Sequence, residues 1–168
     1  LADAGCYGWE TFTDVPGLPG DGPAQRNEPV ATLAALLREA DIPEWAFVLA
    51  ALDRDVYLRM FVAGYDGSPA RALRLLARDP DEDVRLALAR HRNTPPEALE
   101  ILAHDADLSA ARAVGENPST PPGLLAFLAA HRADGVRFGV ARNPSTPAEV
   151  LARLVLDVSP TVRAVAKR

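Results

Sequence analysis

The sequence predicts an all-α protein, an α-solenoid of five 26-residue repeats that follow an N-terminal cap. Two observations support this fold class. Prolines recur at a constant interval, and apolar residues recur at the same interval with the i, i+3, i+4 spacing of an amphipathic helix. The recurring prolines are Pro43, Pro69, Pro95, Pro121 and Pro147.

The N-terminal segment, 1–42, differs from the rest of the chain. Residues 15–23 are rich in Pro and Gly, which favour turns, and a helix is expected around residues 29–40. Residues 1–42 are therefore predicted to be an N-terminal extension with a capping helix. We place the repeats at residues 43–68, 69–94, 95–120, 121–146 and 147–168.

The first helix of each repeat is predicted to begin at the recurring proline. A Ser or Thr precedes the last four prolines, and a hydroxyl at the N-cap with proline at the first helical position is a common helix start. Thr94 with Glu97 and Thr146 with Glu149 have the spacing of a capping box. Two columns of apolar residues follow on one helix face: Phe47, Leu73, Leu99, Leu125 and Leu151, then Ala50, Leu76, Leu102, Leu128 and Leu154.

A second apolar stripe predicts a second helical segment in each repeat. Its columns are Leu58, Val84, Ala110, Val136 and Val162, then Val62, Leu88, Val114, Val140 and Ala166. A single repeat cannot bury both stripes, so neighbouring repeats must stack.

Composition argues against several classes of function. The net charge is −5, with 11 acidic and 4 basic residues in 1–66 but 12 and 14 in 67–168, which disfavours nucleic-acid binding. Cys6 is the single cysteine, so no internal disulfide is expected. No run of about 18 apolar residues and no signal peptide is visible, so we expect no membrane association and a cytoplasmic location.

Several segments resemble the leucine-rich repeat variant family. They are residues 117–122 (Asn-Pro-Ser-Thr-Pro-Pro), residues 143–147 (Asn-Pro-Ser-Thr-Pro) and the pairs Val84-Arg85 and Val136-Arg137. The resemblance covers residues 43–168 and implies a right-handed superhelix that alternates α-helices with short α- or 3₁₀-helices. Some members also have an N-terminal iron–sulfur domain built on clustered cysteines, and this sequence departs from them because Cys6 is its single cysteine.

A periodic arginine column is one candidate binding site: Arg59, Arg85, Arg137 and Arg163. An aspartate column lies six positions earlier, at Asp53, Asp79, Asp105 and Asp157, and such paired columns are similar to those of HEAT-like repeats. The arginines could bind a ligand on one face, or they could bond to carbonyls and aspartates between repeats. Ala111 interrupts the arginine column and His131 interrupts the aspartate column.

Aromatic residues form the second candidate site. Eight of the ten lie between positions 1 and 65, and the binding candidates among them are Trp9, Trp45, Tyr57 and Tyr65. They could seal the open end of the core, or they could form a patch for a basic, partly apolar partner.

No catalytic constellation is visible. The chain has no nucleophile elbow, phosphate-binding loop or dinucleotide fingerprint. His91, His104 and His131 fall in different repeat columns, so no metal site and no cofactor are expected. The sequence therefore favours a non-catalytic scaffold that binds a protein or peptide. The alternative is a nucleic-acid-interacting, repair-related repeat protein that uses Arg71, Arg74, Arg78, Arg90 and Arg92.

Overall fold

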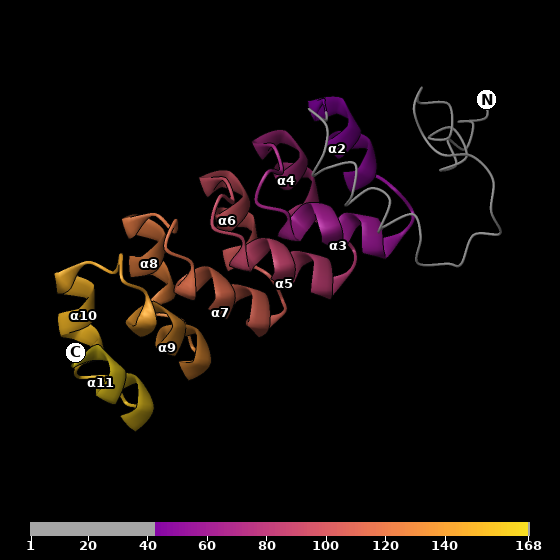
Figure 1. Ribbon diagram of the computed structural model, residues 1–168. Helices are drawn as coiled ribbons and strands as arrows, with labels where there is room; N and C mark the ends of the chain where they lie inside the picture. Colours follow the sequence, from indigo (N-terminus) through magenta and orange to yellow (C-terminus); the bar gives the residue numbers. More distant parts are fainter. Residues whose placement is uncertain (1–42, 168) are drawn as a thin grey trace, which may run out of the picture. The chain divides into compact units, whose positions relative to one another are not determined.

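Ten α-helices in five pairs account for the described part of the chain, residues 43–167 of a computed structural model (Figure 1). The first helices of the pairs are α2 (Glu44–Ala51), α4 (Ala70–Leu76), α6 (Pro96–Ala103), α8 (Pro122–Leu128) and α10 (Ala148–Leu154). The second helices are α3 (Val56–Gly64), α5 (Glu82–Arg90), α7 (Leu108–Glu116), α9 (Asp134–Arg142) and α11 (Pro160–Ala166). The predicted capping helix, Trp9 and Cys6 lie outside the described residues.

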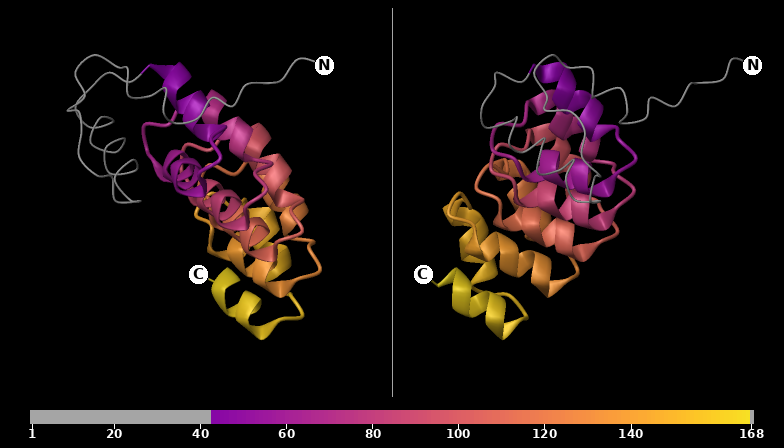
Figure 2. Two further views of the ribbon diagram at one scale, coloured as in Figure 1. Left: turned by 90° about the vertical axis from the view of Figure 1, so that its right-hand side faces the viewer. Right: turned by 45° about the vertical axis from the view of Figure 1, so that its right-hand side comes forward.

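The helices form two rows. Helices α2, α4, α6, α8 and α10 make the first-helix row, and α3, α5, α7, α9 and α11 make the second-helix row (Figures 1 and 2). Contacts join successive helices along the second-helix row and along the first-helix row from α2 to α8, as in α2 with α4 and α3 with α5, and they join the two helices of each pair. The α-solenoid prediction is thus confirmed. In residues 43–167 the second segments are α-helices throughout rather than 3₁₀-helices.

The apolar columns fill the space between the rows. All residues of the columns at Ala50, Leu58 and Val62 are buried, and so are Phe47 and its counterparts in the next three repeats. Leu151, the last member of that column, is half-exposed because it lies in the final pair of helices. No described helix is long and apolar enough to cross a lipid bilayer.

The predicted start of the first helices was wrong by one position. Pro69, Pro95, Pro121 and Pro147 are themselves the N-cap residues, with extended backbone, and their carbonyls accept the first helical hydrogen bonds. No side chain caps these helices, so the capping boxes with Glu97 and Glu149 do not form.

The hydroxyls before these prolines bond backwards instead. The Oγ or Oγ1 atom donates to a carbonyl six positions earlier, in the last turns of the preceding helix, at 2.6 Å in all four cases. The donors are Ser68, Thr94, Thr120 and Thr146, all buried. Each hydroxyl therefore joins the end of one helix to the start of the next.

Helices α7 and α9 approach each other unusually closely. A Cβ atom on Gly139 would lie 2.6 Å from the Arg112 carbonyl oxygen, and one on Gly115 would lie 3.1 Å from the Val140 nitrogen. Glycine is thus required at position 139 for two backbones to pack directly against each other.

Candidate functional site

The arginine column joins neighbouring repeats. Arg85 donates from Nε and Nη2 to the two carboxylate oxygens of Asp105 in the next repeat, at 2.5 and 3.3 Å. Its Nη1 donates to the carbonyls of Asp79 and Pro80 in its own repeat, at 2.7 and 3.1 Å. Each guanidinium thus fixes the turn before its own helix and clamps the turn of the following repeat. A planar guanidinium suits this bidentate geometry.

Three bridges of this kind form in the described repeats, with Nε–Oδ2 distances of 2.5–2.7 Å. The pairs are Arg59–Asp79, Arg85–Asp105 and Arg137–Asp157. Arg163, in the last repeat, holds only the carbonyls of Asp157 and Val158. We call this set the Arg–Asp ladder. Its geometry supports the inter-repeat interpretation of the arginines, because Nε, Nη1 and Nη2 of Arg59, Arg85 and Arg137 already donate hydrogen bonds within the chain.

Electrostatics stabilise the charged form of the ladder. The hydrogen bond to the partner aspartate raises the pKa of Arg59, Arg85 and Arg137. The bond from Arg137 lowers the pKa of Asp157 despite its burial. Burial alone would raise the pKa of Asp105, but bonds from Arg85 and from backbone amides outweigh burial and lower it.

Ala111, which interrupts the arginine column, and His131, which interrupts the aspartate column, occupy the two positions of one missing bridge. Arg85 pairs with a residue 20 positions ahead, and the same offset joins position 111 to position 131. Both partners of this bridge are absent together, so neither leaves an unpaired buried charge. The His131 ring keeps the other task of the aspartate, because its Nδ1 accepts from the Ala133 amide at 3.1 Å.

A second ladder runs along the opposite turns, where each second helix ends. Asn143 donates from Nδ2 to the carbonyls of Gly115 and Asn117, at 2.9 and 2.6 Å. Asn117 donates in the same way to the carbonyls of Ala89 and His91. Nε2 of His91 lies 2.9 Å from the Tyr65 carbonyl oxygen, which extends the series by one repeat.

In the sequence, the Asn-Pro-Ser-Thr-Pro segments indicated only a family resemblance, and the hydrogen bonds of their asparagines to the preceding repeat were not predicted. A periodic signal for these bonds was present, since Asn117 and Asn143 lie one 26-residue period apart. Both side chains are buried. Ser119 and Ser145 add bonds to carbonyls of the preceding repeat. We call these contacts the Asn ladder.

The aromatic candidates have different environments. The Tyr65 ring stacks on Phe61 and Phe47, with centroids 5.4 and 5.8 Å apart, and Phe47 is buried. These three rings therefore close the core at the first repeat. Trp45 and Tyr57 do not, because they are 57% and 64% exposed.

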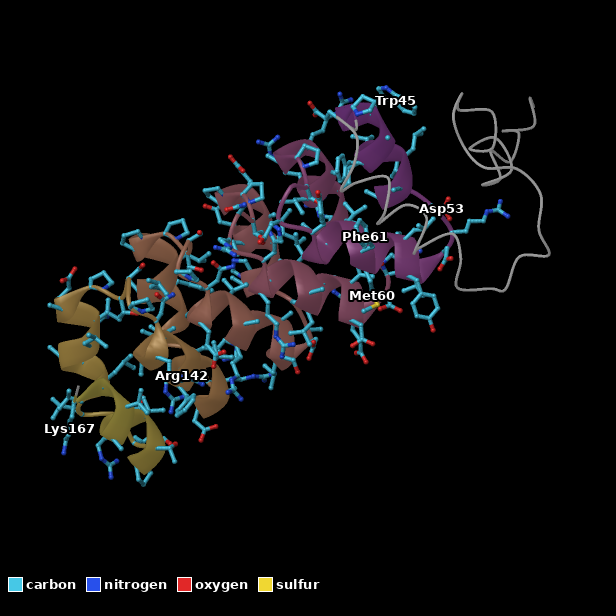
Figure 3. All side chains as sticks on the ribbon, viewed as in Figure 1. Trp45, Asp53, Met60, Phe61, Arg142 and Lys167 are labelled. Atoms are coloured by element: carbon cyan, nitrogen blue, oxygen red, sulfur yellow. The ribbon has the colours of Figure 1, made fainter. Side chains whose placement is uncertain are left out.

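Tyr57 belongs to a surface on the second-helix row that we call the Tyr57 surface. Tyr57 lies in the first turn of α3, and Met60, one turn on, is half-exposed (Figure 3). Leu86, in the equivalent place on α5, is also half-exposed. Glu82 and Asp83, at the start of α5, are exposed and add negative charge.

A shallow groove of about 660 Å³ lies on the first-helix row. Its apolar lining includes Ile101 of α6 and Leu124 and Phe127 of α8, and the His104 ring packs on Phe127 with centroids 4.8 Å apart. Glu97, Glu100 and Arg78 also line it.

The arginines named for nucleic-acid binding do not form one patch. Arg71, Arg74 and Arg78 are exposed on α4 and in the turn after it. Arg90 and Arg92 lie at the far end of α5, in the other row, where Arg92 pairs with Asp66 at 3.1 Å.

Within residues 43–167, no group of three or more His, Cys, Asp or Glu side chains has a geometry that could hold a metal ion. His91 contributes to the Asn ladder, His104 packs on Phe127 and His131 replaces a ladder aspartate.

Comparison with known families supports the resemblance seen in the sequence. Residues 82–107 and 134–159 match the model of the leucine rich repeat variant family. Each match begins with a second helix, α5 or α9, and ends at the N-cap of the second helix of the next repeat. No curated protein and no solved structure matches the chain. The chain therefore carries leucine rich repeat variant units, which start two 26-residue periods apart.

Proposed function

We propose that this chain is a non-catalytic repeat scaffold that binds a protein or peptide through the Tyr57 surface. The observation that carries this proposal is that Tyr57 is 64% exposed on α3, a helix whose buried face already packs against neighbouring helices. Tyrosine combines a large contact area with a polar tip and loses little rotamer entropy on binding, and it is common at interfaces.

The charge around Tyr57 favours a basic, partly apolar partner. Glu82 and Asp83 lie on α5, which packs beside α3, and Asp83 occupies the same repeat position as Tyr57. Carboxylates at the edge of an apolar contact accelerate encounter with a basic partner and disfavour acidic ones.

The Arg–Asp ladder supports this division of roles. Its guanidinium groups already bond to carboxylates and carbonyls, so they stabilise the stack of repeats while other side chains of α3 and α5 face outwards. In solenoids generally, stacked repeats create extended surfaces for partner binding.

The experiment uses a photo-crosslinking amino acid at position 57 of the full chain, in native lysate. We expect one dominant adduct with a basic protein. When chains without the crosslinker are added as competitors, the wild type should reduce the yield of this adduct more than Tyr57→Ala or Leu86→Ala does. A crosslinker at Leu156, an apolar residue that is 83% exposed after α10, is the matched control. Equal adducts from both positions would contradict the proposal, and recovery of nucleic acid instead would favour the alternative function.

A further inference from the structure

We propose that the first-helix row is a self-complementary interface through which two copies of this chain form a twofold-symmetric dimer. This proposal goes beyond the partner-binding function and is independent of it, because the Tyr57 surface lies on the other row.

An apolar stripe runs along the first-helix row. It consists of one residue from the same repeat position of each of α2, α4, α6 and α8: Leu49, Leu75, Ile101 and Phe127. Leu49, Leu75 and Phe127 are 42–50% exposed, and Ile101 is half-buried. Single exposed apolar residues are common on monomers, but a continuous row of them marks an interaction surface.

The residues around this stripe change character in a fixed order. On α2 they are apolar, with Trp45 exposed. On α4 and in its following turn they are basic, with Arg71, Arg74 and Arg78. On α6 they are acidic, with Glu97 and Glu100, and on α8 they are uncharged. From α2 to α8, the order is apolar, basic, acidic and apolar.

This order is complementary to itself under a twofold rotation. An axis between α4 and α6 places the basic α4 of one copy on the acidic α6 of the other, and the reverse contact forms at the same time. The same rotation places α2 on α8, so that Leu49 faces the second copy's Phe127. An isologous interface has this property, because the same patch serves both copies. A partner of uniform charge would meet repulsion on either α4 or α6.

The groove between α6 and α8 of each copy provides a pocket on either side of the twofold axis. Its apolar lining includes Ile101 and Phe127, and its acidic edge includes Glu97 and Glu100. In the proposed dimer it receives side chains from α2 of the second copy, including Trp45, while the arginines on α4 approach the acidic edge. Aromatic anchors in such pockets supply much of the binding energy at interfaces.

The charged side chains are available for contacts between copies. Arg74 and Glu97 make one loose contact within the chain, with Nε and Oε2 3.6 Å apart, and both remain more than half exposed. Among residues 43–167, Arg71, Arg78 and Glu100 have no ion-pair partner.

The size of the face predicts a weak, reversible dimer. Four helices about 10 Å apart, each about 11 Å long, present about 450 Å² per copy, or about 900 Å² in total. This is below the roughly 1,200 Å² of the smallest stable interfaces. Dimer formation should therefore depend on protein concentration and on salt.

The test is sedimentation equilibrium of the full chain, from about 10 μM to about 1 mM. We expect reversible dimerisation in the wild type. In R71E/R74E the charged residues of α4 and α6 all become acidic, and in E97R/E100R they all become basic, so each variant alone should dissociate at least about tenfold more easily. An equimolar mixture of the two variants should form a heterodimer, because every charge contact between copies becomes attractive again.

Matched controls separate the interface from general charge effects. R90E/R132E makes the same change of charge as R71E/R74E at exposed sites at the end of α5 and in the turn between α8 and α9, and it should dimerise like the wild type. Melting temperatures check that each variant is folded. A wild type that stays monomeric throughout the concentration range, or variants that fail to associate when mixed, would overturn the proposal.

Discussion

Replacing Arg85 with alanine should destabilise the chain by about 2–4 kcal/mol. The change removes both bonds to Asp105 and both bonds to backbone carbonyls, and it leaves the Asp105 carboxylate, whose side chain is only 10% exposed, without its counter-ion. Loss of one partner from a fully buried pair typically costs about 3–5 kcal/mol. We use a lower figure because the Arg85 side chain is 17% exposed and Asp105 keeps a bond from the Asp107 amide.

The chain itself supplies the control for this prediction. The double variant R85A/D105H reproduces the Ala111–His131 combination, in which the charge is absent and the histidine still accepts the turn amide. It should recover a large part of the lost stability. Urea unfolding followed by circular dichroism measures both variants. Our reasoning would be refuted if R85A unfolded like the wild type, or if the double variant were no more stable than R85A.

Three further predictions concern other contacts. Gly139→Ala should lower the free energy of unfolding by at least about 2 kcal/mol, because the new methyl group would clash with a backbone carbonyl of α7. Gly135→Ala, on the same helix but with open space around it, should raise the free energy of unfolding by about 0.5–1 kcal/mol. Thermal unfolding compares the two variants. Asn117→Asp should cost about 2–4 kcal/mol in urea unfolding, because it replaces the amide that bonds to two carbonyls of the preceding repeat with a carboxylate. The lowered pKa values of Asp105 and Asp157 contribute stability that is complete above the unfolded value of about 3.8 and is lost as pH falls through the lower folded values. Urea midpoints between about pH 6 and about pH 3 should therefore fall in the wild type and fall less steeply in Asp157→Asn.

The periodic features of the fold could be predicted from sequence because the core repeats with the same interval as the prolines. Residues of the apolar columns such as Leu73 and Val84 are buried as expected. The helix starts were less predictable, because the Thr94 hydroxyl can either donate or accept a hydrogen bond near the proline. It donates to the Leu88 carbonyl instead of accepting from the next helix. Local sequence cannot distinguish these roles, because the choice depends on how the preceding helix packs.

The contacts between repeats were only partly predictable. One of the two interpretations of the arginine column was that the arginines bond to carbonyls and to aspartates between repeats, and Arg85 does both: it donates to the Asp79 carbonyl, and its carboxylate partner is Asp105 in the next repeat. Neighbouring repeats lie side by side, so a contact 20 positions ahead in sequence is close in space. The exposure of Tyr57 and Trp45, in contrast to the stacked ring of Tyr65, also depends on helix orientation at the first repeat.

The most direct test of the division between structural and partner-binding residues compares Tyr57→Ala with Arg59→Ala. Both residues lie on α3, two positions apart, but Tyr57 is exposed whereas Arg59 bonds to Asp79 and to carbonyls of the preceding turn. Melting temperature and yield of the position-specific partner adduct, now from a crosslinker at Met60, are measured together on both variants. We predict that Tyr57→Ala keeps the wild-type melting temperature and loses the adduct, and that Arg59→Ala melts at a lower temperature but yields the adduct while folded. Unchanged stability and a lost adduct in Arg59→Ala, with an undiminished adduct in Tyr57→Ala, would contradict the account.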